Sequence, residues 1–362
     1  MNDSHARRYF AASNSCQGFR NYYGDIFTDT RTDRLYIIKG GPGTGKSHFM
    51  KLIACHAREV GYDVIEYACS SDPHSLDGIL LTREGKPTVG FLDGTAPHVW
   101  EPIMPGAKED IINLGVFWDG NRLAGQKKII QHLGDGKTAA YGRAYAYLAA
   151  CGEVDRVADS LTGRCVPEGK IHALAKRLLR DQPSGSVFSA VPALRRAVSM
   201  AGHCCLHSFE GESCAAGGTL LQLSDYYGIG YRVTAALFAL SAEKKLTVQV
   251  SYDPVYPHKI DGLYYPNTGL CILLGEAEPC EGSVYRSISL RRYVDAEILR
   301  SVRCKLRHAC RLRDSLLESA LGELAEASKF HFELERIYAD AMDFSAKEAF
   351  TESFCRSLFE NV

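Results

Sequence analysis

Residues 40–47 read Gly40-Gly41-Pro42-Gly43-Thr44-Gly45-Lys46-Ser47 and match the pattern G-x-x-x-x-G-K-[ST]. The apolar run Leu35-Tyr36-Ile37-Ile38 precedes this loop and is typical of a buried parallel strand. Apolar residues at helical spacing follow the loop at Phe49, Leu52, Ile53 and Val60. The sequence therefore predicts a strand, a glycine loop and a helix in that order, which is the arrangement of a phosphate-binding P-loop.

The residue types of this loop suit a nucleoside triphosphate. Glycines let the backbone turn its N–H groups inward, and the start of the helix adds further donors for phosphate. We expect Lys46 to reach the β- and γ-phosphates and the Ser47 hydroxyl to bind Mg²⁺. No N-K-x-D stretch supports guanine selectivity, so ATP is the expected nucleotide. The predicted nucleotide-binding residues are Gly40, Gly41, Pro42, Gly43, Thr44, Gly45, Lys46, Ser47 and His48.

A magnesium ion at this loop needs a carboxylate at the end of a neighbouring strand. Residues 88–93 form a mostly apolar run that ends in Asp93, which favours Asp93 as this ligand. Residues 63–68 form a second strand-like run, and it leads to Asp72, the alternative ligand. The predicted metal ligands are therefore Ser47 and Asp93, with Asp72 in second place.

The sequence offers no acidic residue directly after Asp93 to activate water, because Gly94 follows it. His98 is the preferred candidate for this role, and Asp72 and Glu101 are the others, since the group must come within hydrogen-bond reach of the water. A loop histidine that caps a turn is the ordinary explanation of His98. The predicted catalytic residues are Lys46, Asp93 and His98.

Composition narrows the class of protein. The chain has 362 residues, with 42 Lys and Arg against 43 Asp and Glu and a formal net charge of −1. This length fits two or three domains, and the balanced charge gives no general reason to bind nucleic acid or an acidic membrane surface. No apolar stretch approaches the roughly 20 residues of a membrane-spanning helix, and the first residues lead into no signal segment. We expect a cytoplasmic protein.

The two halves of the chain resemble each other. Residues 34–52 align without gaps with residues 219–237 at an offset of 185, and residues 112–119 align with residues 288–295 at an offset of 176. We predict an α/β fold of two tandem P-loop NTPase-like α/β/α units, each followed by a helical segment. The expected domains are residues 1–182 and residues 187–362, which pack as an intramolecular pseudo-dimer. General similarity between any two α/β units is the weaker explanation.

The second half lacks the groups that would bind phosphate and Mg²⁺. A tyrosine and an arginine stand where the first loop has its lysine and serine, and a leucine replaces the strand-end aspartate. An additional aspartate would place negative charge where phosphate should lie. The aligned residues are Lys46 and Tyr231, Ser47 and Arg232, Asp93 and Leu274, and Gly40-Gly41 and Asp225-Tyr226.

Several strings besides the glycine loop are similar to a known family. They are Cys69-Ser70-Ser71-Asp72-Pro73, Ser75-Leu76-Asp77-Gly78, Asp93-Gly94-Thr95-Ala96-Pro97-His98, Pro105-Gly106-Ala107 and Ile111-Ile112-Asn113-Leu114-Gly115. The chain resembles a poorly characterised bacterial family of duplicated P-loop ATPases, found mainly in spore-forming and related Gram-positive lineages. The resemblance implies the fold and ATP binding but no cellular role. Members of that family carry a working P-loop in both halves, and this chain departs from them in its second half.

The preferred interpretation is a Mg²⁺-dependent ATPase or an ATP-driven conformational switch with one working site per chain and an unidentified protein partner. A small-molecule kinase is one alternative, because helices at residues 120–180 could form a lid, although no arginine-rich string lies near the first site. A scaffold that binds nucleotide without turnover is the other alternative, and Gly94 after Asp93 favours it.

Two further clusters have ordinary explanations. His203, Cys204, Cys205, His207 and Cys214 are metal-binding residue types, but no C-x-x-C pair among the thirteen cysteines supports a tetrahedral site. Residues 291–313 are rich in Lys and Arg, and Arg300, Arg303, Arg307 and Arg311 share one helical face. A solvated basic face is the preferred interpretation of this stretch, and a surface for nucleic acid or an acidic partner is the alternative.

Overall fold

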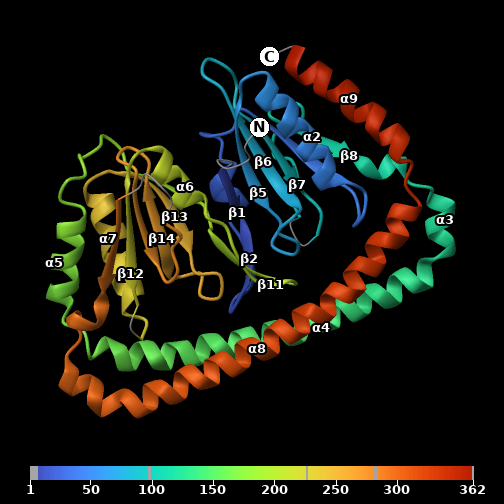
Figure 1. The fold of residues 1–362 in the computed structure, drawn as a ribbon. Helices are drawn as coiled ribbons and strands as arrows, with labels where there is room; N and C mark the ends of the chain where they lie inside the picture. The colour runs from blue at the N-terminus through green and yellow to red at the C-terminus, as the bar shows by residue number, and fades with distance from the viewer. Residues whose placement is uncertain (1–6, 97–98, 226, 280–283, 361–362) are drawn as a thin grey trace.

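The computed structural model describes residues 7–96, 99–225, 227–279 and 284–360. It is a mixed α/β structure with two six-stranded mixed sheets. The sheets belong to two units that lie next to each other, and a pair of long helices runs along one side of both units (Figure 1).

The first unit contains a sheet in the order β1-β5-β6-β7-β4-β8, in which β6 alone is antiparallel to its neighbours. A hairpin of β2 and β3 stands apart from it. The elements are β1 (Arg7–Phe10), β2 (Ala12–Ser15), β3 (Gly18–Asn21), α1 (Tyr23–Ile26), β4 (Arg34–Lys39), α2 (Lys46–Glu59), β5 (Asp63–Ala68), β6 (Leu76–Thr82), β7 (Val89–Asp93) and β8 (Glu109–Asn113).

The second unit repeats this order of elements. Its sheet runs β9-β13-β14-β15-β12-β16, with the hairpin of β10 and β11 beside it. Each strand therefore has a counterpart at the same place in the first sheet. The elements are β9 (Ser189–Pro192), β10 (Arg196–Ser199), β11 (Gly202–Cys205), α6 (Ser208–Ala215), β12 (Thr219–Ser224), α7 (Ile229–Glu243), β13 (Thr247–Tyr252), β14 (Ile260–Tyr265), β15 (Leu270–Leu274) and β16 (Val284–Ser289).

The strand before the glycine loop is buried because parallel neighbours flank it and helices cover the sheet. β4 pairs in parallel with β7 on one side and β8 on the other. Leu35, Ile37 and Ile38 are each 0% exposed, as a continuous apolar run predicts. The following helix buries Phe49 and Ile53, but Val60 lies after the end of α2 and is 40% exposed, so it does not belong to the helical face that the spacing predicts.

The units meet about an approximate two-fold axis. The two hairpins have the same turn, with Gly18 at φ 87° and Gly202 at φ 99°, which sets an offset of 184. At that offset Phe10 corresponds to Leu194, and these two residues bond to each other: Phe10 N donates to Leu194 O (2.7 Å) and Leu194 N donates to Phe10 O (3.2 Å). Equivalent residues that pair with each other are what a two-fold relation requires.

Each unit continues into helices, as the sequence predicts, but these helices cross to the other unit. After β8 come η1 (Leu114–Phe117), α3 (Gly120–Gly125), α4 (Lys127–Gly163) and α5 (Glu168–Leu178). After β16 come η2 (Leu290–Tyr293), α8 (Ala296–Asp340) and α9 (Phe344–Glu360). α4 carries the chain from the first unit to the second, and α8 brings it back alongside α4 (Figure 1). As a result α5 packs on α7, and α9 packs on α2.

The long helices meet through equivalent residues. Ala144, Leu148 and Cys151 of α4 are buried, and so are Ala320, Leu324 and Ala327 of α8, which stand 176 positions later. Leu148 and Leu324 belong to one apolar cluster between the helices. The offset of 176 also relates the first residues of α5 and α9, Glu168 and Phe344. None of the described helices is both long and apolar enough to cross a bilayer.

We expect Leu148→Ala to destabilise the whole chain, because Leu148 is 0% exposed at the crossing of α4 and α8. Truncating a leucine in such a place costs about 3 kcal/mol of the free energy of unfolding. Urea denaturation measures this loss. The matched control is Tyr147→Ala at the adjacent position, which is 38% exposed and should change stability by less than about 1 kcal/mol. Equal losses in the two variants would contradict the described crossing.

Candidate functional site

The glycine loop joins the end of β4 to the start of α2. Gly43 (φ 71°) and Gly45 (φ 79°) adopt left-handed conformations that other residues rarely take, and Gly45 precedes the first helical residue. The Thr44 hydroxyl donates to Gly41 O (2.9 Å) and is held inside the loop. These conformations place the N-terminus of α2 and its unpaired N–H groups at the floor of a cleft.

Lys46 folds back over this loop. Its Nζ donates to Gly40 O (2.9 Å) and Gly41 O (2.8 Å) and lies 3.5 Å from Asp93 Oδ2. Its side chain is 12% exposed. The ammonium group thus rests on the loop's own carbonyl groups and on the strand-end carboxylate.

Asp93 stands at the end of β7, the strand beside β4, as the sequence predicts. It is 8% exposed, and its Oδ1 accepts hydrogen bonds from Thr95 N (2.9 Å) and from the Thr95 hydroxyl. Burial raises the pKa of Asp93 above its ordinary value, although Lys46 and Thr95 oppose the rise. A carboxylate that has lost so much of its water gains strongly from a cation placed beside it.

The other predicted metal ligands face the same cleft. Ser47 Oγ accepts a hydrogen bond from Leu76 N (2.9 Å), and Asp72 accepts from His74 N (3.1 Å) and the Ser75 hydroxyl (2.7 Å). A further carboxylate, Asp77, lines the cleft at 3% exposure. The sequence alone assigned Asp77 no role at the site, although the dipeptide Asp77-Gly78 recurs in the second half as Asp261-Gly262.

The hydroxyl of Tyr23 donates to Asp77 Oδ2 (3.2 Å). Asp77 also raises the pKa of Asp93 by charge repulsion. The two carboxylates therefore act on one another at the head of the cleft, which concentrates negative potential where a cation would be stabilised.

The cleft has a volume of about 1050 Å³, and the returning helix α8 forms one wall. A Cβ on Gly43 would lie 2.3 Å from Glu335 O, so the helix and the loop are in direct contact. The sequence did not single out the α8 residues of this wall, because they lie some 290 positions after the loop. Lys137 comes from α4, and α8 contributes His331, Phe332, Glu335, Arg336 and Ala339.

Two predicted residues lie outside the cleft, and a third is not among the described residues. His48 is exposed and lines a separate hollow of about 510 Å³ between α2 and α9, not the cleft. Its pKa is lowered by burial of the ring and by Lys347. Glu101 pairs with Lys39 at 2.7 Å. His98 lies outside the described residues.

In the second unit an aspartate fills the corresponding loop. Asp225 accepts hydrogen bonds from Gly228 N (2.9 Å) and Gly230 N (2.6 Å), the counterparts of Gly43 and Gly45. A carboxylate of the chain itself therefore occupies the N–H groups that would otherwise face phosphate. The carboxylate of Asp225 thus lies at the loop, where the sequence predicts negative charge.

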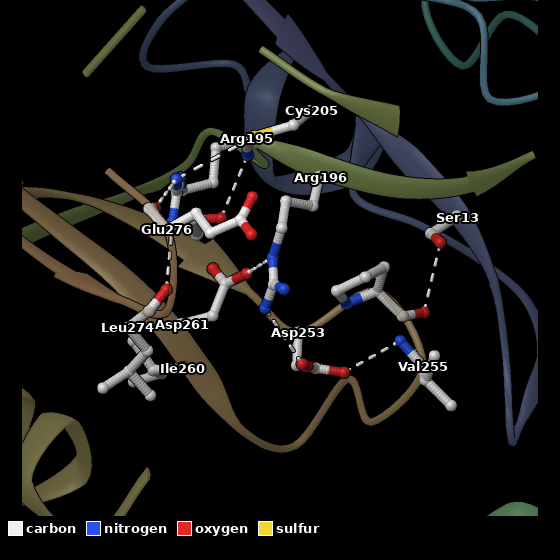
Figure 2. A network of polar contacts seen from close by, with 12 residues as sticks. Ser13, Arg195, Arg196, Cys205, Asp253, Val255, Ile260, Asp261, Leu274 and Glu276 are labelled. Atoms are coloured by element: carbon white, nitrogen blue, oxygen red, sulfur yellow. Dashed lines mark hydrogen bonds and ion pairs between the residues drawn. The ribbon is translucent and has the colours of Figure 1, made fainter. Parts of the chain in front are cut away.

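Arg196 neutralises Asp253 and Asp261, which stand in the second half where the first half has Asp72 and Asp77. Arg196 Nε lies 2.5 Å from Asp261 Oδ2, and its guanidinium lies 3.2 Å from Asp253 Oδ2 (Figure 2). Asp253 also accepts from the Tyr231 hydroxyl at 2.6 Å. Burial raises the pKa of Asp261, and Arg196 opposes that rise. The acidic groups at this point of the second unit are thus neutralised by an arginine of the chain itself.

The neighbouring Arg195 lies just before β10, is 1% exposed and has a different set of partners. Its guanidinium donates to Leu274 O (3.3 Å) and Glu276 O (2.9 Å) and pairs with Glu210 at 3.3 Å (Figure 2). Leu274 ends β15 and stands where the first unit has Asp93. An arginine that bonds to the Leu274 carbonyl therefore lies at this end of β15.

Among the described residues, one group of three metal-ligand types lies close together: Asp155, Asp159 and His258. Lys259 Nζ lies 2.6 Å from Asp155 Oδ2 and 2.9 Å from Asp159 Oδ2, so a lysine already neutralises both acids. On α8, Arg300, Arg303, Arg307 and Arg311 are exposed.

We expect Arg196→Met to lower the free energy of unfolding by about 3 kcal/mol at pH 7.5, because it leaves two buried carboxylates without their cation. Burial already raises the pKa of Asp261 in the folded chain, and loss of Arg196 raises it further. The folded variant then binds a proton more readily than its unfolded state does, so the deficit should shrink as the pH falls toward 5.

Denaturation of the variant and the wild type at both pH values measures this difference. Arg307→Met, which removes an exposed arginine, is the control and should show no deficit. A deficit for Arg196→Met that grows on acidification would contradict the assignment.

No known protein family, curated protein or solved structure matches the chain.

Proposed function

We propose that the chain binds ATP and Mg²⁺ at the first glycine loop and is a P-loop ATPase or an ATP-driven conformational switch with one working site per chain. The single observation that carries this proposal is the meeting of Lys46, Ser47 and Asp93 around the N-terminus of α2, at the end of two adjacent parallel strands.

The loop fits a polyphosphate. Lys46 donates only to loop carbonyls and lies near one carboxylate, and a phosphate oxygen is a stronger, charged acceptor than a carbonyl. The left-handed glycines and the helix start present backbone N–H groups to the same cleft. Glycine at position 43 is also required by the contact with α8, where a Cβ would overlap Glu335 O.

The oxygen atoms at the head of the cleft fit a hard divalent cation. Ser47, Asp93 and Asp72 supply the hydroxyl and carboxylate oxygens that Mg²⁺ prefers, and Asp77 adds a buried carboxylate beside them. Bound there, Mg²⁺ would neutralise charge on the phosphates during transfer. The protein's part is to orient the phosphate chain with Lys46 and the backbone, and to hold the metal-side carboxylates in place.

Contact between the loop and α8 supports a switch. The proposed nucleotide site lies between the first unit and helices from the second half of the chain. A nucleotide bound there therefore affects how these helices pack on the first unit. Nucleotide binding without turnover is the second candidate, and the observation that favours it is Gly94, which follows Asp93 where an acidic residue would activate water.

We expect Lys46→Ala to weaken binding of a non-hydrolysable ATP analogue by about 100-fold, because it removes a charged donor to phosphate. Calorimetry should give about one site per wild-type chain and none of comparable affinity in the variant. The matched control is Lys51→Ala on the same helix, whose exposed ammonium donates to His74 O (2.7 Å). A second site that survives Lys46→Ala would refute the single-site proposal.

We expect Asp93→Asn to lower Mg²⁺-dependent phosphate release by about 100-fold, and Asp72→Asn to lower it less. Asp93 lies 3.5 Å from Lys46 and is 8% exposed, whereas Asp72 is only half-buried. Phosphate release over a range of Mg²⁺ concentrations measures both variants. If Asp72→Asn is the more damaging change, the metal-side carboxylate belongs to the other strand.

A further inference from the structure

Lys347 of α9 is a buried lysine beside the glycine loop. It is 1% exposed, and its Nζ lies 3.1 Å from the point where a Cβ would stand on Gly45. Gly45 and Phe344, one turn earlier on α9, both line the cleft, and the Lys347 ammonium lies 5.8 Å from the centre of the Phe344 ring. A residue from the end of the chain thus reaches the start of α2.

No described residue gives this ammonium group a hydrogen bond or an ion pair. Burial lowers the pKa of Lys347, and the charge of the neighbouring Glu348 opposes that change. The positive end of the α2 dipole adds to the cost of a cation at this place. Buried charges in folded proteins are normally paired, so the surroundings of Lys347 lack an anion.

The second unit shows what this position requires when no phosphate is bound. α5 and α9 begin at equivalent residues, and the offset of 176 relates Lys347 to Ile171. Ile171 is 5% exposed and packs in the apolar core against α7. An apolar side chain therefore satisfies the fold beside the degenerate loop, and the lysine occurs only beside the loop that carries Lys46 and Ser47.

The geometry points to Lys347 as a phosphate-binding residue that the C-terminal helix contributes to the first loop. The anion it lacks is the phosphate chain of the nucleotide bound to Gly40–Ser47, and this inference rests on the proposed function. The nucleotide site is then composite: the first unit supplies the loop and the carboxylates, and the last helix supplies a second phosphate-binding lysine.

The test compares Lys347→Met with Lys329→Met. Lys329 is an exposed lysine of α8 that pairs with Glu326, so its loss changes the net charge equally without touching the cleft. We expect Lys347→Met to weaken binding of Mg²⁺ and a non-hydrolysable ATP analogue by about 10- to 100-fold, and Lys329→Met to leave it unchanged. In the absence of nucleotide, the melting temperature of Lys347→Met should equal or exceed that of the wild type, because an unpaired buried charge is removed.

A purely structural lysine would give the opposite pattern. A lower melting temperature without nucleotide, together with unchanged affinity, overturns the inference. Lys347→Ile, which copies Ile171, serves in the same way if the methionine variant does not fold. Absence of binding by the wild-type chain would overturn the proposed function itself, whereas wild-type binding that depends on Lys46 but not on Lys347 overturns the inference alone.

A second measurement uses the wild-type chain and so does not depend on whether a variant folds. An acyl-phosphate derivative of ATP transfers its acyl group to lysine amines that lie against the bound phosphates, and mass spectrometry identifies the acylated peptides. We expect acylation of both Lys46 and Lys347, and suppression of both by excess ATP. Acylation of Lys46 with none at Lys347 overturns the inference.

Discussion

The antiparallel packing of α4 against α8 is the constraint on which the rest of the structure depends. Each helix leaves one unit and ends on the other, and their crossing buries equivalent residues such as Leu148 and Leu324. Because of this exchange, each glycine loop lies against the long helix of the other half: Gly43 against Glu335 of α8, and Gly228 near Asp159 of α4. The wall of the first cleft comes from α8 and the helix beside α2 is α9, so the site forms only when both halves are folded together.

The two units differ in how they pair their buried charged groups. Buried polar and charged groups must be paired, and the second unit pairs them within the chain: Asp225 occupies the loop, and Arg196 holds Asp253 and Asp261. The first unit pairs its charged groups less completely. Lys46 lies 3.5 Å from Asp93, yet burial raises the pKa of Asp93, and the ammonium group of Lys347 has no hydrogen-bond or ion-pair partner among the described residues. In our proposal this difference makes the first cleft the place where an external anion and cation contribute most.

In our proposal, the exchange of helices allows a bound nucleotide to act on the packing of α4 and α8. The loop at Gly43 touches Glu335 O, and in the second unit Asp159, which aligns with Glu335, accepts a hydrogen bond at its O from Arg232 (3.2 Å). The first contact lies beside the proposed ligand, whereas the second is a fixed hydrogen bond within the chain. A change of ligand would act on one end of the paired helices while the other end stays anchored to the degenerate unit.

The sequence by itself determined the local elements of this protein and most of the chemistry of the first loop. A continuous apolar run predicts β4, the glycine pattern predicts the left-handed turns at Gly43 and Gly45, and the internal repeat predicts two units with the same order of strands. These features follow from short-range rules of spacing and backbone conformation. Only the tertiary structure decided which helix covers which unit. The return of α8 brings Glu335 to Gly43, and α9 brings Lys347 to Gly45, and no local pattern encodes contacts between residues some 290 to 300 positions apart. The same holds for Asp77, whose place beside Asp93 depends on the register of β6 against β7 and not on any motif.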